Sequence, residues 1–178
     1  SLGGLYNELK SGTLADIGIY SLNRHKHIHC GEGGICVTNN DKLAERISLI
    51  RNHGEAVVDG MGVENISNLI GFNYRMTEIE AAIANEQLKK LDYFVNKRIQ
   101  ACNKIIDKFK NIDGIICPKE QSHTKNVFYY LCFKINKNKL GLSRKAFCAA
   151  INAEGIPFGE GGYLPIYLQS MYQKKIAY

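Results

Sequence analysis

The chain has 178 residues, of which 45% are hydrophobic and 22% charged, and its formal net charge is +6. This length suits one domain, or one domain with part of a second, and the composition excludes collagen-like, repetitive and disordered proteins. The basic residues are spread along the chain without a nucleic-acid-binding motif, and no apolar run reaches the roughly 18 residues of a membrane span, so we expect neither nucleic acid nor membrane as a partner.

Cysteine usage points to a reducing compartment. The six cysteines stand at positions 30, 36, 102, 117, 132 and 148, and no two have the C-x-x-C spacing of zinc or thioredoxin-like sites. We expect no secretory signal, and the chain is too large to need a disulfide scaffold. We therefore expect reduced cysteines in a cytoplasmic protein.

The first part of the chain predicts two strands and a helix. Apolar and β-branched residues predict strands at 17–22 and 34–38, with a Gly-rich loop between them. Asn40 or Asp41 is suited to cap a helix that runs to about Asn52 and ends at His53-Gly54. The loop between the two strands holds Lys26.

The middle of the chain predicts a long helix. Residues 54–75 are Gly-rich and irregular, and Thr77 with Glu80 then has the spacing of a capping box. Apolar residues then recur at intervals of three and four positions as far as Phe109, which places them on one face of a helix. A helix of this length often links two domains or lies along a partner.

The last third of the chain predicts short strands and one helix in place of a long helix. The aromatic-rich segment 127–135 predicts a strand, Ser143 caps a helix that Gly155 ends, and residues 156–158 are strand-like. We place a domain boundary near residue 112. Because the chain starts abruptly and ends where a helix begins, we expect a fragment of a longer protein.

The chemistry-bearing segment is SLNRHKHIHCGEGG, residues 21–34. A lysine amine attacks an aldehyde only when it is neutral, and burial or positive neighbours lower the lysine pKa from its usual value of about 10.4. Arg24, His25 and His27 supply such neighbours for Lys26. The spacing alone is compatible with a catalytic lysine and does not establish one.

Several motifs in the same order resemble one family. S-x-x-x-x-K, then G-E-G-G and V-T-N, is similar to the active-site signature of the DegT/DnrJ/EryC1/StrS sugar aminotransferases. ELKSGTLADIGIYS, DKLAERISLIRNHG, GFNYRMTEIEAAIANEQLKKLD and the Ala-Glu-Gly-Ile stretch at 153–156 resemble further parts of that family. The resemblance covers essentially the whole chain.

The resemblance implies an α/β fold, fold type I of the pyridoxal-phosphate (PLP) transferases. Residues 1–112 would form the C-terminal part of the large cofactor-binding domain with its long linking helix, and residues 113–178 part of a small domain. Lys26 would form the Schiff base with PLP and move the proton, while Ser21 would bind the cofactor phosphate. Asn73 would reach the phosphate of a neighbouring subunit, in a homodimer with a shared active site.

The implied reaction moves an amino group from glutamate or glutamine to a keto sugar, usually one linked to a nucleotide. The aspartate that the family pairs with the pyridine nitrogen would precede Ser1, so this piece alone is expected to be inactive. His25, His27 and His53 are candidate substrate contacts. His25-x-His27-x-His29 lacks a supporting carboxylate or cysteine cluster, so we expect no metal. Gly31–Gly34 would allow close backbone approach, with Glu32 supporting the loop.

Three alternatives stay open. Some members of the family are PLP-dependent sugar dehydratases, although those replace the lysine with histidine. A non-catalytic homologue could act as scaffold or regulator, although the chain retains Lys26, Ser21 and Asn73. A basic nucleic-acid-binding module is supported by the net charge alone.

Overall fold

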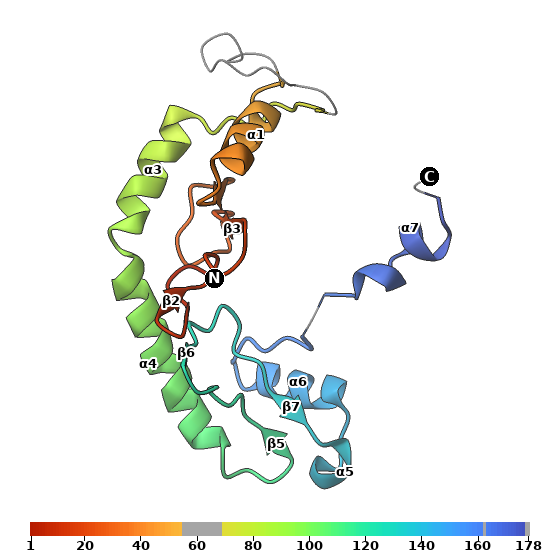
Figure 1. Cartoon of the computed structure of the whole chain (residues 1–178). Helices are drawn as coiled ribbons and strands as arrows, with labels where there is room; N and C mark the ends of the chain where they lie inside the picture. The colour runs from red at the N-terminus through yellow and green to blue at the C-terminus, as the bar shows by residue number, and fades with distance from the viewer. Residues whose placement is uncertain (55–68, 162, 177–178) are drawn as a thin grey trace. The chain divides into compact units, whose positions relative to one another are not determined.

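The computed structural model describes residues 1–54, 69–161 and 163–176, and the chain forms two compact units. The first unit comprises residues 1–105 and 119–131, and the second comprises 106–118 and 132–178 (Figure 1). Residues 119–131 thus belong to the first unit although they follow the start of the second. The predicted domain boundary at residue 112 remains a prediction.

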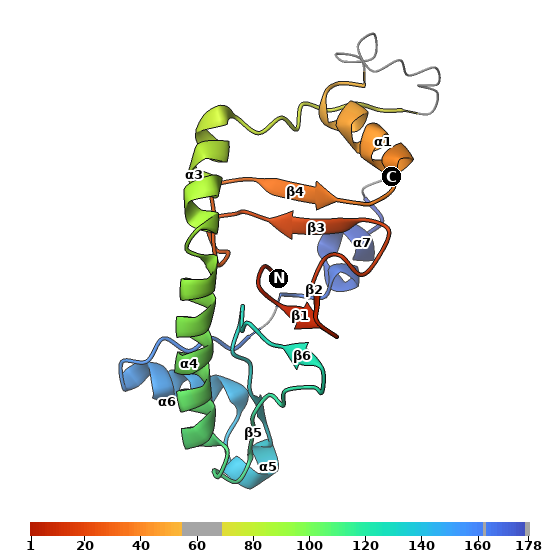
Figure 2. The same ribbon diagram turned by 60° about the vertical axis from the view of Figure 1, so that its left-hand side comes forward.

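A β-hairpin carries the Lys26 loop in the first unit. Strands β3 (Gly18–Ser21) and β4 (Gly34–Val37) pair antiparallel, with Ser21 opposite Gly34 (Figure 2). Two backbone hydrogen bonds continue the pairing into the loop: Leu22 N donates to Gly33 O at 2.8 Å, and Cys30 N donates to Leu22 O at 3.1 Å. The two strands predicted from the sequence are confirmed.

A second small sheet brings a late segment of the chain into the first unit. Strand β1 (Leu5–Tyr6) lies between β2 (Leu9–Lys10) and β6 (Thr124–Lys125), and both pairings are antiparallel. Because β6 is followed directly by residues 126–131, this sheet determines where Tyr129 lies. The sequence did not predict this pairing.

Helix α1 (Asp41–Arg51) begins and ends as the sequence predicts. The Asn40 side chain accepts a hydrogen bond from Leu43 N at 3.2 Å, and His53 (φ 66°) and Gly54 (φ 78°) leave the helix in the left-handed conformation. Residues 55–68, most of the segment predicted to be irregular, lie outside the described residues. Residues 69–75 contain no helix or named strand.

The apolar stripe forms two helices where the sequence predicted one helical stretch. Helix α3 (Glu78–Leu88) has the predicted capping box, since Glu80 N donates to Thr77 Oγ1 and Thr77 N donates to the Glu80 carboxylate. Helix α4 (Leu91–Phe109) follows after a tight turn in which Lys90 N donates to Gln87 O at 3.0 Å. No helix in the described ranges is long and apolar enough to cross a membrane.

A small apolar core lies beneath the Lys26 loop. Leu22, Ile28 and Cys30 are buried there, and the partly buried residues packed against them are Leu2, Met76, Ala84 and Leu91. Leu22, which directly follows β3, and Ile28, in the middle of the loop, therefore fix the loop to this core. Because its two anchors are buried, the loop holds Lys26 in a defined place.

The second unit is built from a short sheet and short helices. Strands β5 (Ile115–Ile116) and β7 (Lys134–Ile135) pair antiparallel. The remaining elements are α5 (Lys137–Leu140), α6 (Arg144–Ala153), the 3-10 helix η1 (Ile166–Leu168) and α7 (Ser170–Gln173). Ser143 caps α6 and Gly155 follows it with φ 83°, as the sequence predicts.

Two predicted strands are wrong. Of residues 127–135, only Lys134–Ile135 form a strand, because Phe128 has a left-handed φ of 48° and its N–H donates to the Asn126 side chain instead of to a neighbouring strand. Residues 156–158 are not a strand, since Asn152 binds both the N–H and the carbonyl of Phe158. In both cases a local side-chain bond replaces a strand pairing.

Candidate active site

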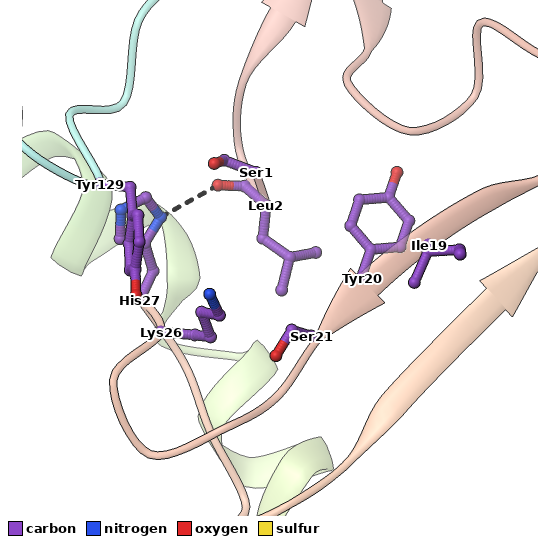
Figure 3. Close-up of a pocket in the computed structure, with 8 residues that line it drawn as sticks. All are labelled: Ser1, Leu2, Ile19, Tyr20, Ser21, Lys26, His27 and Tyr129. Atoms are coloured by element: carbon purple, nitrogen blue, oxygen red, sulfur yellow. Dashed lines mark hydrogen bonds between the residues drawn. The ribbon is translucent and has the colours of Figure 1, made fainter. Parts of the chain in front are cut away.

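Lys26 and Ser21 lie in the same cavity, of about 210 Å³. Figure 3 shows their side chains in one space, Ser21 from the end of β3 and Lys26 from the loop that follows. The other lining residues are Ser1, Leu2, Ile19, Tyr20, His27 and Tyr129. A primary amine and a hydroxyl separated by four residues in sequence thus face one cavity.

Asn23 organises the loop that presents Lys26. The Asn23 carbonyl accepts from Lys26 N at 2.9 Å, and its side-chain amide donates to Glu32 Oε1 at 2.7 Å. Glu32 therefore makes the contact expected of a residue that supports the loop. The role of Asn23 was not predicted from the sequence. An Asn at the start of a turn commonly accepts a hydrogen bond from nearby backbone, and here the Asn23 side chain accepts one from His25 N at 3.1 Å.

The Gly31–Gly34 turn needs glycine at two positions. Gly31 has φ 94°, a left-handed conformation that side chains rarely adopt. At Gly33 an added Cβ would lie 2.7 Å from Cys30 Sγ and 2.9 Å from Met76 Cε. These glycines let the loop fold back tightly over its own core.

Tyr129 faces Lys26, which the sequence did not predict. The Lys26 Nζ lies 4.3 Å from the centroid of the Tyr129 ring, and the His27 ring meets the same tyrosine edge-on at 6.1 Å. Tyr129 lies in the segment 127–135, which the sequence predicts to be a strand. Its ring face instead contacts the amine, because β6 brings this segment to the loop.

His27 is a neutral hydrogen-bond acceptor in this cavity. Burial lowers the pKa of its imidazole, and the positive charges of Arg98 and Lys26 lower it further, against a hydrogen bond to Leu2 O that raises it. The ring Nδ1 lies 3.2 Å from Leu2 O, so Nδ1 carries the proton (Figure 3). The buried Nε2 has no hydrogen-bond partner among the described residues and is therefore an open acceptor.

The lowered His27 pKa predicts a pH-dependent contribution to stability. Between the folded pKa and the ordinary value near 6.5, the unfolded chain binds the proton more tightly, so stability falls as pH falls below 6.5. His27→Gln should remove this loss: its melting temperature relative to wild type should rise as the pH is lowered from 7 to 5. Full-length protein should be measured, with His29→Gln as matched control; a pH-independent difference would contradict the assignment.

A second cavity, of about 650 Å³, adjoins the first through Lys26 and His27, which line both. Its other lining residues are Arg24, His25, His29, Gln87, Phe94 and Arg98. The three alternating histidines lie in a loop, not on one face of a strand. Within the described ranges, no three His, Cys, Asp or Glu side chains are grouped as metal ligands would be.

Asn73 and His53 line neither of these two cavities. Both lie at the end of α1, where Asn52 and Asn73 form an isolated antiparallel bridge and His53 N donates to Phe72 O at 2.9 Å. The buried Asn52 side chain accepts from Arg75 Nη1 at 2.9 Å. The segment that carries Asn73 is thus fixed to the end of the helix, with the Asn73 residue exposed.

The sequence of the chain matches one protein family over its whole length. A model of the DegT/DnrJ/EryC1/StrS aminotransferase family matches residues 1–178. The chain is 38% identical over 106 residues to the UDP-4-amino-4,6-dideoxy-N-acetyl-beta-L-altrosamine transaminase of Campylobacter jejuni, covering 58% of the chain and 27% of that protein. The chain spans about half the length of the curated relatives that it matches along its full extent, 47% and 46% for two of them.

Solved structures give the same fold. Helicobacter pylori PseC, an aminotransferase involved in the biosynthesis of pseudoaminic acid, matches with a TM-score of 0.81 and 26% identity over 98% of the chain and 46% of its own. The E. coli GDP-4-keto-6-deoxy-D-mannose-3-dehydratase with bound hydrated PLP matches with a TM-score of 0.75 and 27% identity over 88% of the chain and 43% of its own. The α/β architecture is that of PLP-dependent transferases of fold type I.

Proposed function

Because the chain belongs to the DegT/DnrJ/EryC1/StrS aminotransferase family, we propose that it carries the catalytic lysine, Lys26, of a PLP-dependent sugar aminotransferase. The observation that supports this most directly is the single cavity that holds the Lys26 amine and the Ser21 hydroxyl. The proposal concerns the full-length protein, since the chain spans about half the length of its relatives.

The residues of this cavity fit the chemistry of PLP. A primary amine is the group that bonds to an aldehyde, and a hydroxyl at the end of a strand is a suitable donor to a phosphate. The buried His27 Nε2, without a partner among the described residues, leaves an acceptor free for a ligand donor. Lys26 would hold the cofactor covalently and Ser21 would hold its phosphate.

When bound, PLP withdraws electrons from the carbon whose proton is removed. Lys26 supplies the amine that moves this proton, and the face of the Tyr129 ring lies 4.3 Å from its Nζ. The neutral His27, fixed by Leu2 O, accepts a hydrogen bond without adding a positive charge next to Lys26. In this proposal the Lys26 amine moves the proton, and Tyr129 and His27 position the amine and its surroundings.

The names of the relatives support a substrate class. The names of matched proteins include a UDP-sugar transaminase and a GDP-perosamine synthase, the latter 38% identical over 52% of the chain. The proposed acceptor is therefore a keto sugar linked to a nucleoside diphosphate. Glutamate or glutamine is the proposed amino donor.

The active site is proposed to be shared between two subunits. Asn73 lines neither of the two cavities around Lys26, but it is displayed on a segment fixed by the Asn52–Arg75 contact. An exposed amide held in this way is suited to reach the cofactor phosphate of a partner subunit in a homodimer. We also propose residues 1–112 and 113–178 as parts of a large and a small domain.

A sugar dehydratase is the second candidate, since one of the matched structures is a PLP-containing dehydratase. The lysine at position 26 favours amino transfer, because the sugar dehydratases of the family that the sequence resembles have histidine in place of this lysine. Mass spectrometry of the sugar product separates the two reactions: an amino group gained in place of the keto oxygen indicates aminotransferase, and a lost water without nitrogen indicates dehydratase.

Ser21→Ala tests the phosphate contact. Loss of a hydrogen bond to a charged group costs about 1.5–3 kcal/mol, so the Kd for PLP should rise about 10- to 100-fold. Ser21→Thr, which keeps the hydroxyl on a strand-compatible side chain, should retain most of the affinity. Fluorescence titration of the full-length apoprotein measures both variants, and an unchanged Kd in Ser21→Ala would remove Ser21 from the proposed site.

A further inference from the structure

The second cavity is strongly basic. Six of its eight lining residues are Arg, Lys or His, and the other two are Gln87 and Phe94. None of the lining residues is acidic, and no ion pair between described residues involves Arg24, Lys26 or Arg98. The charges of Arg24, Lys26 and Arg98 attract an anion and otherwise repel one another, whereas the neutral His27 adds no charge.

Each of the two arginines, Arg24 and Arg98, uses only part of its guanidinium in the hydrogen bonds found among the described residues. Arg24 uses its Nε in a 3.3 Å contact to His25 Nε2, and Arg98 uses one Nη in a 3.4 Å contact to Phe128 O. A guanidinium has five N–H donors in a planar fork that matches phosphate oxygens. Arg24 comes from the Lys26 loop and Arg98 from α4, so the two forks reach the cavity from different elements.

We propose that this cavity binds the diphosphate of the nucleotide-linked substrate, with Arg24 and Arg98 as its principal ligands. The identity of the ligand as a nucleotide sugar rests on the proposed function. Lys26 and His27 line both cavities, so a molecule held by its diphosphate in the second cavity has its sugar end next to the reactive amine.

The size and lining of the cavity favour a nucleoside diphosphate over a single small anion. Its volume of about 650 Å³ is about three times the 210 Å³ of the cavity around Ser21. Phe94, 38% exposed, offers an apolar ring surface, and Gln87 offers an uncharged donor and acceptor for a base or ribose. Arg24 and Arg98 would bind the two phosphates.

UDP and GDP, each without a sugar, are the probes for this site. Isothermal titration of the full-length protein should show that Arg24→Gln and Arg98→Gln each raise the Kd of the bound nucleotide by about 10-fold or more. Arg98→Lys keeps the charge and should recover part of that loss. Lys97→Gln is the matched control: it removes a charge from the neighbouring position of α4, lines neither cavity and should leave the Kd unchanged.

The same preparations should be reduced with borohydride to measure cofactor trapped on Lys26. Trapping in both arginine variants, with weakened nucleotide binding, supports the inference and shows that the variants are folded. Wild-type affinity in both arginine variants would overturn it, as would a wild type that traps cofactor and binds neither nucleotide. Arginine-dependent nucleotide binding without trapped cofactor would leave the inference standing and contradict the proposed function.

Discussion

Replacing Lys26 with Ala in the full-length protein should lower the rate of the glutamate half-reaction by about 10³-fold or more, because this one amine is proposed both to hold the cofactor and to move the proton. The amine is placed for this by the hairpin turn at Asn23 and by the ring of Tyr129, 4.3 Å from Nζ. Stopped-flow absorbance after mixing with excess glutamate measures the loss.

Two further variants separate the amine from its charge. Lys26→Arg keeps the positive charge but has no nucleophilic amine, so it should be as slow as the alanine variant. Lys42→Ala removes an exposed lysine from the first turn of α1 and should react like wild type. Near-normal rates in Lys26→Ala would mean that another group carries the chemistry.

Leu22→Ala should destabilise the full-length protein by about 2–5 kcal/mol. Leu22 is 1% exposed, and it packs with Ile28 and Cys30 in the core beneath the Lys26 loop. The truncation leaves a cavity directly under the segment that links Ser21 to Lys26, so cofactor occupancy should fall together with stability. Chemical denaturation and the visible absorbance of the cofactor measure the two effects.

Leu14→Ala is the control for this truncation. Leu14 belongs to the same unit but is 52% exposed, so the same change should alter stability by less than about 0.5 kcal/mol. Equal effects of the two substitutions would contradict the packing described for the Lys26 loop. Loss of stability in Leu22→Ala with full cofactor occupancy would show that the loop does not depend on this core.

Local signals predicted much of the first unit. The apolar and β-branched residues around Ser21 and Gly34 predicted both strands of the hairpin. The caps at Asn40 and Thr77, and at Ser143 in the second unit, predicted the starts of three helices. These features depend on residues within a few positions of one another. That Lys26 and Ser21 share a site was expected from the resemblance of the S-x-x-x-x-K motif to the family signature, and their spacing alone did not establish it.

Features that depend on distant residues were missed. Tyr129 reaches Lys26 only because β6 pairs with β1, a contact across more than a hundred residues that the aromatic pattern does not encode. The same pattern wrongly predicted a strand, since Phe128 takes a left-handed conformation that bulky residues rarely adopt. The sequence around Arg98 gave no functional signal, and its proposed role rests on the cavity that it lines together with Arg24.

The most direct test of the central claim is to reduce the full-length protein with borohydride in the presence of PLP and to locate the modified peptide by mass spectrometry. We predict that the cofactor is trapped on Lys26, with a loss of visible absorbance that matches one cofactor per chain. Trapping on a different lysine, or no trapping at all, would contradict the assignment of Lys26 and favour a non-catalytic role for this member of the family.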